Sequence, residues 1–182
     1  MTTETTKIAF FGDSYVVRLE RWGVIPDVPG RFRFFGQGGM RAQRPHQQLL
    51  ERMLRWEPDV VIVVLGGNDI TSRCQPRDIS LDILKLCRLV KARGVATVVV
   101  AGICQRWAFR DNALTSDRFT AIGSAIDRCV KRYFPVSSMV HVREDVHWLS
   151  DGVHLSEEGM AEFMESLRLK LAKIFKPKDL VL

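Results

Sequence analysis

The chain lacks any run of apolar residues long enough to cross a lipid bilayer, which takes about 20 residues in a helix. This absence excludes helical membrane proteins. The first six residues, MTTETT, are polar and contain no apolar stretch of the kind found in a secretory signal. We therefore expect a cytoplasmic protein whose residues 1–6 are flexible.

Cysteine is scarce, and its spacing is too wide for a structural zinc site. The four cysteines are Cys74, Cys87, Cys104 and Cys129. Cys87 and Cys129 fall on the apolar sides of predicted helices, and we interpret all four as reduced residues of the core. We expect neither a metal nor a cofactor.

The chain has fewer acidic than basic residues. Its 21 Asp and Glu and its 27 Lys and Arg give a formal net charge of +6. The arginines are spread along the chain in pairs such as Arg31/Arg33 and Arg41/Arg44. Scattered charge of this kind is typical of a solvated surface, but it also favours a polyanionic partner bound through its phosphates.

What the chain does contain is the composition of a globular protein, with 46% hydrophobic and 26% charged residues among 182. A chain of this length is sufficient for one hydrophobic core. Neither a repeat, a low-complexity segment nor a linker divides it. We therefore predict a single domain over residues 1–182.

Apolar runs of strand length alternate with segments of helical periodicity. Strands are predicted at 8–11, 31–35, 59–65, 95–101 and 139–142, and helices at 15–21, 41–56, 78–93, 116–133 and 156–175. The unbroken β-branched run at 59–65 indicates a central strand that is buried on both faces. The alternation predicts the α/β class, with a parallel sheet of about five strands inside a three-layer α/β/α sandwich.

Reactive residues follow the strands of this predicted sheet. Ser14 comes directly after the first strand, in KIAFFGDSY, and we predict that it is a nucleophile. A serine hydroxyl needs a base, and the neutral imidazole of His154 suits that role near neutral pH. Asp151, three residues earlier, is placed to fix the tautomer of His154.

An acyl-transfer site also needs donors for the oxyanion that develops in the reaction. Three candidates are the backbone N–H of Ser14, the backbone N–H of Gly39 and the side-chain amide of Asn68. Gly36 and Gly38 compete with Gly39, which we favour because the chain after it runs directly into a predicted helix.

Each of these motifs also has a structural interpretation, since an isolated GDS is a common turn and an Asp-x-x-His is often the end of a loop. Their order along the chain and their positions after strands favour a hydrolytic site. His147 is a rival base, with Glu144 as its nearest acidic neighbour. Trp107 and Trp148 lie in loops and are candidates for the substrate pocket.

The chain resembles the SGNH, or GDSL-like, hydrolases. The resemblance extends from Lys7 to about Phe175 and is carried by GDS at 12–14, GQGGM at 36–40, GGND at 66–69 and DGVH at 151–154. It implies a flavodoxin-like fold and the hydrolysis or transfer of esters, including acetyl groups on sugars and acyl chains on lipids. It also implies a triad and an oxyanion site formed by Ser14, Asp151, His154, Gly39 and Asn68.

Two classes of function follow. The first is a serine esterase that hydrolyses small, acetyl-type esters of a small molecule, carbohydrate or lipid through an acyl-enzyme. The alternative is a binding module that keeps the hydrolase fold and binds nucleic acid or another polyanion. The arginine content and small size are also similar to esterase domains carried by some retrotransposon open reading frames.

Overall fold

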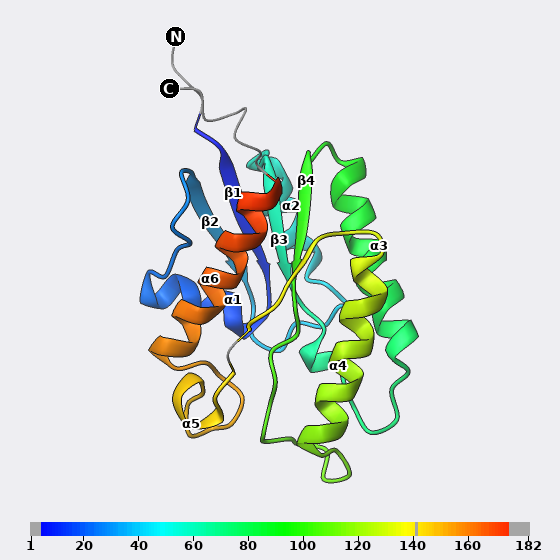
Figure 1. The fold of residues 1–182 in the computed structure, drawn as a ribbon. Helices are drawn as coiled ribbons and strands as arrows, with labels where there is room; N and C mark the ends of the chain where they lie inside the picture. The colour runs from blue at the N-terminus through cyan, green and yellow to red at the C-terminus, as the bar shows by residue number, and fades with distance from the viewer. Residues whose placement is uncertain (1–4, 141, 175–182) are drawn as a thin grey trace.

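The structure is a computed structural model, and it describes residues 5–140 and 142–174 (Figure 1). Residues 1–4 of the segment expected to be flexible, and Phe175 at the predicted end of the last helix, lie outside the described residues. The sheet has five parallel strands in the order β2-β1-β3-β4-β5. They are β1 (Lys7–Gly12), β2 (Arg31–Gly36), β3 (Val60–Val64), β4 (Thr97–Ala101) and β5 (Val136–Ser137).

Helices cover both faces of this sheet (Figure 1). The helices are α1 (Ser14–Trp22), α2 (Gln47–Arg55), α3 (Pro76–Ala92), α4 (Ser116–Lys131), α5 (Glu144–His147) and α6 (Glu157–Ile174), with a 3-10 turn η1 at Gly67–Asp69. Side chains of α1 and α6 pack on one face, and those of α2, α3 and α4 pack on the other. The predicted fold class is confirmed, and the strand order is that of flavodoxin-like sheets.

Alternate residues of each strand enter the two cores. Ile8 and Phe10 of β1 pack toward α1 and α6, whereas Ala9 and Phe11 pack toward the opposite helices. Phe10 and Phe11 are both completely buried, and each contributes about 1.5–3 kcal/mol to stability through the removal of its side chain from water. All five residues of β3 are buried, as the β-branched run predicted.

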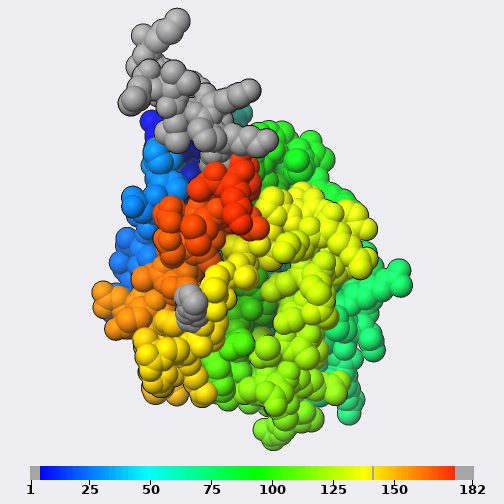
Figure 2. Space-filling model, in the orientation of Figure 1, coloured from blue at the N-terminus to red at the C-terminus, as the bar shows by residue number. Residues whose placement is uncertain are grey.

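The first four predicted strands are confirmed, but the fifth is wrong. It was expected at 139–142 and lies at Val136–Ser137. Pairing with β4 begins as soon as the chain leaves α4, because the carbonyl of Pro135 accepts a hydrogen bond from the N–H of Val100. Val140, inside the expected strand, is 68% exposed. Figure 2 shows the segment after β5, in yellow, crossing the face between α4 and α6.

The start of the second helix also differs from the prediction. The second helix begins at Gln47 rather than at 41, because the Asp69 carboxylate accepts the N–H groups of Ala42 and Gln43 and holds this stretch as a loop. α4 begins at Ser116, as predicted, and Thr115 is its N-cap, since the hydroxyl of Thr115 accepts the N–H of Arg118. Gly39 therefore leads into a loop and not directly into a helix.

The order of the strands creates a crevice at their carboxyl ends. β2 lies on one side of β1, and β3 lies on the other, so the connections diverge where β1 ends. Ligands of open α/β sheets bind at this kind of topological switch point. A Cβ on Gly12 would collide with the carbonyl of Val64, so the lack of a side chain lets β1 and β3 approach closely just before Ser14.

None of the helices within the described ranges is long and apolar enough to cross a membrane.

Candidate active site

Ser14, His154 and Asp151 form one continuous chain of hydrogen bonds. The Oγ atom of Ser14 lies 3.0 Å from Nε2 of His154, and Nδ1 of His154 lies 2.6 Å from Oδ2 of Asp151. An ionised carboxylate can only accept hydrogen bonds, so the proton of the neutral imidazole is on Nδ1. Nε2 then presents its lone pair to the Ser14 hydroxyl and is able to take the hydroxyl proton.

Ser14 is the first residue of α1, and the turn before it is firmly held. Asp13 is the N-cap of this helix, and its buried carboxylate accepts the N–H of Tyr15 at 3.0 Å. The N–H of Asp13 in turn donates to the carbonyl of Val64 on the neighbouring strand. The first N–H groups of a helix have no partner within the helix, so the N–H of Ser14 is suited to bind a developing negative charge.

Asp151 and His154 are positioned by the loop that joins them. Oδ1 of Asp151 accepts the backbone N–H groups of Val153 and His154, both at 2.9 Å. Partial burial raises the pKa of the Asp151 carboxyl, but these hydrogen bonds and the imidazole outweigh it and lower the pKa to about 2. Asp151 is therefore ionised throughout the neutral range.

The rival base, His147, is separate from this chain of hydrogen bonds. Its Nδ1 accepts the backbone N–H of Arg143, the N-cap of α5, at 2.9 Å. This bond gives His147 a local structural role.

Asn68 is tied to the loop that contains Gly39. Nδ2 of Asn68 donates to the carbonyl of Met40 at 3.0 Å, which ties η1 to the loop after β2. Gly39 has a φ of +76°, a left-handed conformation that side chains disfavour. Asp69 holds the same loop through Ala42 and Gln43.

Two residues that sequence reasoning missed support these loops. Tyr15 donates its hydroxyl to the carbonyl of Val153 at 2.5 Å, next to His154. Nη1 of Arg106 donates to Oδ1 of Asn68 at 3.1 Å. The sequence contains only a weak signal for Arg106, an arginine in the aperiodic loop after β4, because its partner lies 38 residues away.

Comparison with known proteins supplies the family. The model of the GDSL-like lipase/acylhydrolase family matches residues 10–162. The chain belongs to this family. This acylhydrolase is thus an ester hydrolase, and no curated protein matches its sequence at a significant level.

Solved structures show the same fold. A lipase/acylhydrolase from Enterococcus faecalis is 16% identical with a TM-score of 0.72, over 94% of this chain and 98% of that one. A GDSL-like lipase from Bacteroides thetaiotaomicron is 18% identical with a TM-score of 0.64, over 93% and 89%. An acetylxylan esterase from Geobacillus stearothermophilus is 15% identical with a TM-score of 0.62, over 91% and 94%.

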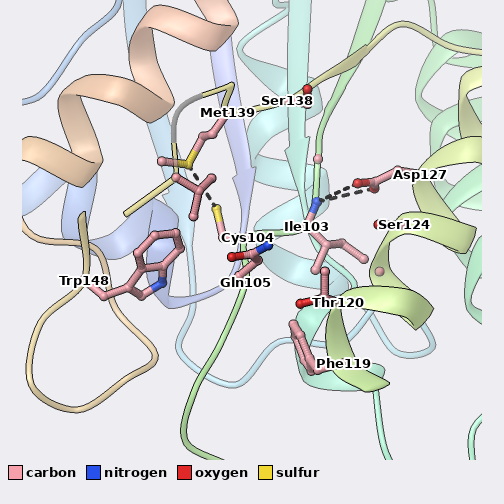
Figure 3. Close-up of a pocket in the computed structure, with 13 residues that line it drawn as sticks. Ile103, Cys104, Gln105, Phe119, Thr120, Ser124, Asp127, Ser138, Met139 and Trp148 are labelled. Carbon is pink, nitrogen blue, oxygen red and sulfur yellow. Dashed lines mark hydrogen bonds between the residues drawn. The ribbon is translucent and has the colours of Figure 1, made fainter. Parts of the chain in front are cut away.

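The two tryptophans predicted to line the pocket pack against each other. Their rings meet edge to face with centroids 4.5 Å apart. Trp148 is buried and lines a cavity of about 160 Å³ between the loop after β4, α4 and the segment after β5 (Figure 3). Neither Ser14 nor His154 is among the residues that line it. The role of both tryptophans in substrate binding stays a prediction.

Four cysteines of this acylhydrolase are unpaired, and only Cys87 is fully buried, while the other three are half-buried. Within residues 5–140 and 142–174, no group of three or more His, Cys, Asp and Glu side chains is arranged to hold a metal ion.

A half-buried acidic side chain in the wall of the cavity gives a testable pH dependence. The Asp127 carboxylate accepts the N–H of Ile103 at 3.3 Å, just beyond β4 (Figure 3). Burial raises the pKa of this carboxyl to about 7, although the hydrogen bond from Ile103 opposes the shift. In the folded protein Asp127 therefore holds its proton to a higher pH than in the unfolded chain.

The free energy of unfolding should thus fall as the pH rises from about 4 to about 7, because ionisation of Asp127 is easier in the unfolded state. The variant Asp127→Asn cannot ionise at this position, so it lacks this part of the pH dependence of the free energy of unfolding. We expect the free energy of unfolding of this variant to rise relative to that of the wild type through this pH window. The upper bound of this rise is about 4 kcal/mol. Urea unfolding at several pH values measures it, with the exposed Asp27→Asn as control. A constant difference across the window would contradict the prediction.

Proposed function

We propose that the protein is a serine esterase that cleaves small acyl esters through an acyl-enzyme. The observation that carries this proposal is the continuous chain of hydrogen bonds from Ser14 through His154 to Asp151. In the first step Oγ of Ser14 attacks the ester carbonyl while its proton passes to Nε2 of His154.

The oxyanion of the tetrahedral intermediate would be bound by the N–H of Ser14, the N–H of Gly39 and Nδ2 of Asn68. The hydrogen bond from Asn68 to the residue after Gly39 supports this grouping. His154 then gives its proton to the leaving alcohol as the C–O bond breaks. Water, deprotonated by His154, attacks the acyl-Ser14 ester and releases the acid, which restores the free hydroxyl.

The acyl group that we propose for this reaction is short, such as acetyl. The structural similarity to an acetylxylan esterase agrees with an acetyl substrate.

A series of activated acetyl, butyryl and octanoyl esters tests this assignment. We expect kcat/KM to be highest for the acetyl ester, in line with the structural similarity to an acetylxylan esterase. An increase in kcat/KM with chain length would instead assign the enzyme to lipid substrates.

The arginine-rich surface supports a second candidate function, the binding of a polyanion. Arg41, Arg44 and Arg73 are exposed on loops that follow β2 and β3. Binding of single-stranded nucleic acid should weaken steeply between about 50 and 200 mM salt, since each neutralised phosphate releases counterions. Fluorescence anisotropy measures this, and absence of binding at the lower salt concentration removes the candidate.

A further inference from the structure

We propose that Arg106 is a positioning residue that fixes the orientation of the Asn68 amide for the reaction. The inference rests on the proposed function, in which Nδ2 of Asn68 binds the oxyanion. It assigns a role to a residue outside the motifs that carry the family resemblance.

The argument begins with the chemistry of the two side chains. An amide group can rotate by half a turn and exchange its carbonyl oxygen for its NH₂ group. A guanidinium group has donors and no acceptor, so its partner in Asn68 must be the carbonyl oxygen. The bond from Nη1 of Arg106 to Oδ1 of Asn68 therefore turns Nδ2 toward Met40 and the site of the oxyanion. In the opposite orientation, the NH₂ group of Asn68 would face the N–H donors of the Arg106 guanidinium group.

Arg106 is itself held in a defined place. Its guanidinium carbon lies 5.8 Å from the centre of the Tyr15 ring and 5.5 Å from that of Phe119, within the range of cation–π contacts. Gly67, directly before Asn68, leaves the space for it. A Cβ at position 67 would lie 2.5 Å from Nη2 of Arg106. The guanidinium group of Arg106 thus occupies space that is free only because residue 67 is a glycine.

The charge of Arg106 adds a second effect. A hydrogen bond from a charged donor is stronger than one from a neutral donor, and it polarises the amide so that Nδ2 becomes a better donor. No ion pair between Arg106 and a carboxylate occurs in the part of the chain that the structure describes. Its positive charge acts on the buried Asp13 carboxyl, whose pKa is raised by burial and lowered to a smaller extent by Arg106. In the proposal the same charge also favours negative charge on the far side of Asn68.

Burial of this arginine does not serve stability alone. Nε of Arg106 is buried and has no hydrogen-bond partner among residues 5–140 and 142–174. A buried donor without a partner destabilises the folded state. The contact with Asn68 gives a reason for an arginine at this position despite its unpaired Nε.

Steady-state kinetics on an activated acetyl ester tests the proposal with Arg106→Met, Arg106→Lys and the exposed control Arg110→Met. We expect Arg106→Met to lower kcat by about 10- to 100-fold with little change in KM, as is typical when a supporting hydrogen bond to a functional residue is lost. Arg106→Lys, which keeps the charge and a donor, should recover part of the loss. Arg110→Met should behave like the wild type.

A double-mutant cycle with Asn68→Ala decides whether Arg106 acts through Asn68. Asn68→Ala alone should lower kcat by about 10²–10³-fold, the usual effect of removing one oxyanion donor. Once Asn68 is absent, Arg106→Met should cause no further loss. An equal loss in both backgrounds would overturn the proposal, and so would wild-type kcat in Arg106→Met.

The cycle also separates this inference from the proposed function. If Asn68→Ala is harmful while Arg106→Met is not, only the inference on Arg106 fails. If Asn68→Ala has no effect, the assigned oxyanion donor fails and the inference with it. Should Arg106→Met not fold, Gly67→Ala replaces it in the same cycle, because the added Cβ displaces the guanidinium without removing it.

Discussion

Replacing Ser14 with alanine is expected to lower kcat for an activated acetyl ester by a factor of about 10⁴–10⁶, as in other serine hydrolases that lose their nucleophile. The Oγ atom of Ser14 faces Nε2 of His154 at 3.0 Å. Without this oxygen no acyl-enzyme forms, and the imidazole can only assist the direct attack of water. The measurement is turnover at saturating substrate.

Two controls make this result specific to the nucleophile. Ser150→Ala changes an exposed serine next to Asp151 and should keep wild-type turnover. Ser14→Ala should unfold at nearly the same temperature as the wild type, because the half-buried hydroxyl is replaced by a smaller apolar group. A fluorophosphonate probe should label the wild type and not the variant. Labelling that persists in Ser14→Ala would show that the nucleophile is another residue.

The second large effect is expected for Asp151→Asn, with a loss in kcat of about 10³–10⁴-fold near neutral pH. Oδ1 of Asp151 accepts two backbone N–H groups, so an asparagine would keep its carbonyl oxygen there. Its NH₂ group would then face Nδ1 of His154 and require that nitrogen to accept. The imidazole proton would move to Nε2, which faces Ser14 and could no longer take a proton from it.

A matched control is Asp145→Asn, which neutralises an exposed carboxylate that pairs with Arg143 in the same region. It should leave kcat unchanged. Because the pKa of Asp151 is about 2, ionisation of this carboxyl should not shape the pH profile of the wild type between about pH 5 and 9. Equal kcat values for Asp151→Asn and Asp145→Asn would exclude Asp151 from the mechanism.

The general architecture could be predicted from periodicity because burial requires it. A strand covered on both faces, such as β3, must be apolar throughout, and a helix on a sheet must be apolar along one side only. The wrong strand at 139–142 illustrates the limit of this reasoning. A two-residue strand such as β5 has no pattern of its own, and its place is set by where α4 ends and where β4 offers partners.

The site shows a similar division. The order of the motifs predicted that Ser14, Asp151 and His154 would meet, and the geometry brings them into one chain of hydrogen bonds, while their roles stay predictions. The reason for choosing Gly39 was wrong, since a loop held by Asp69 follows it. A contact between a side chain and a distant loop leaves no periodic signal.

The sequence by itself determined the family, the alternation of strands and helices, and the presence of serine, histidine and aspartate after strands. These features depend on local patterns, which a single chain displays directly. Only the tertiary structure decided which loops touch, and thus that Arg106 contacts Asn68, that Tyr15 supports the loop before His154 and that Asp127 is half-buried. Such contacts arise from the packing of segments far apart in the chain. The segment KIAFFGDSY supplies Ser14, but the residues around Ser14 come from three other loops.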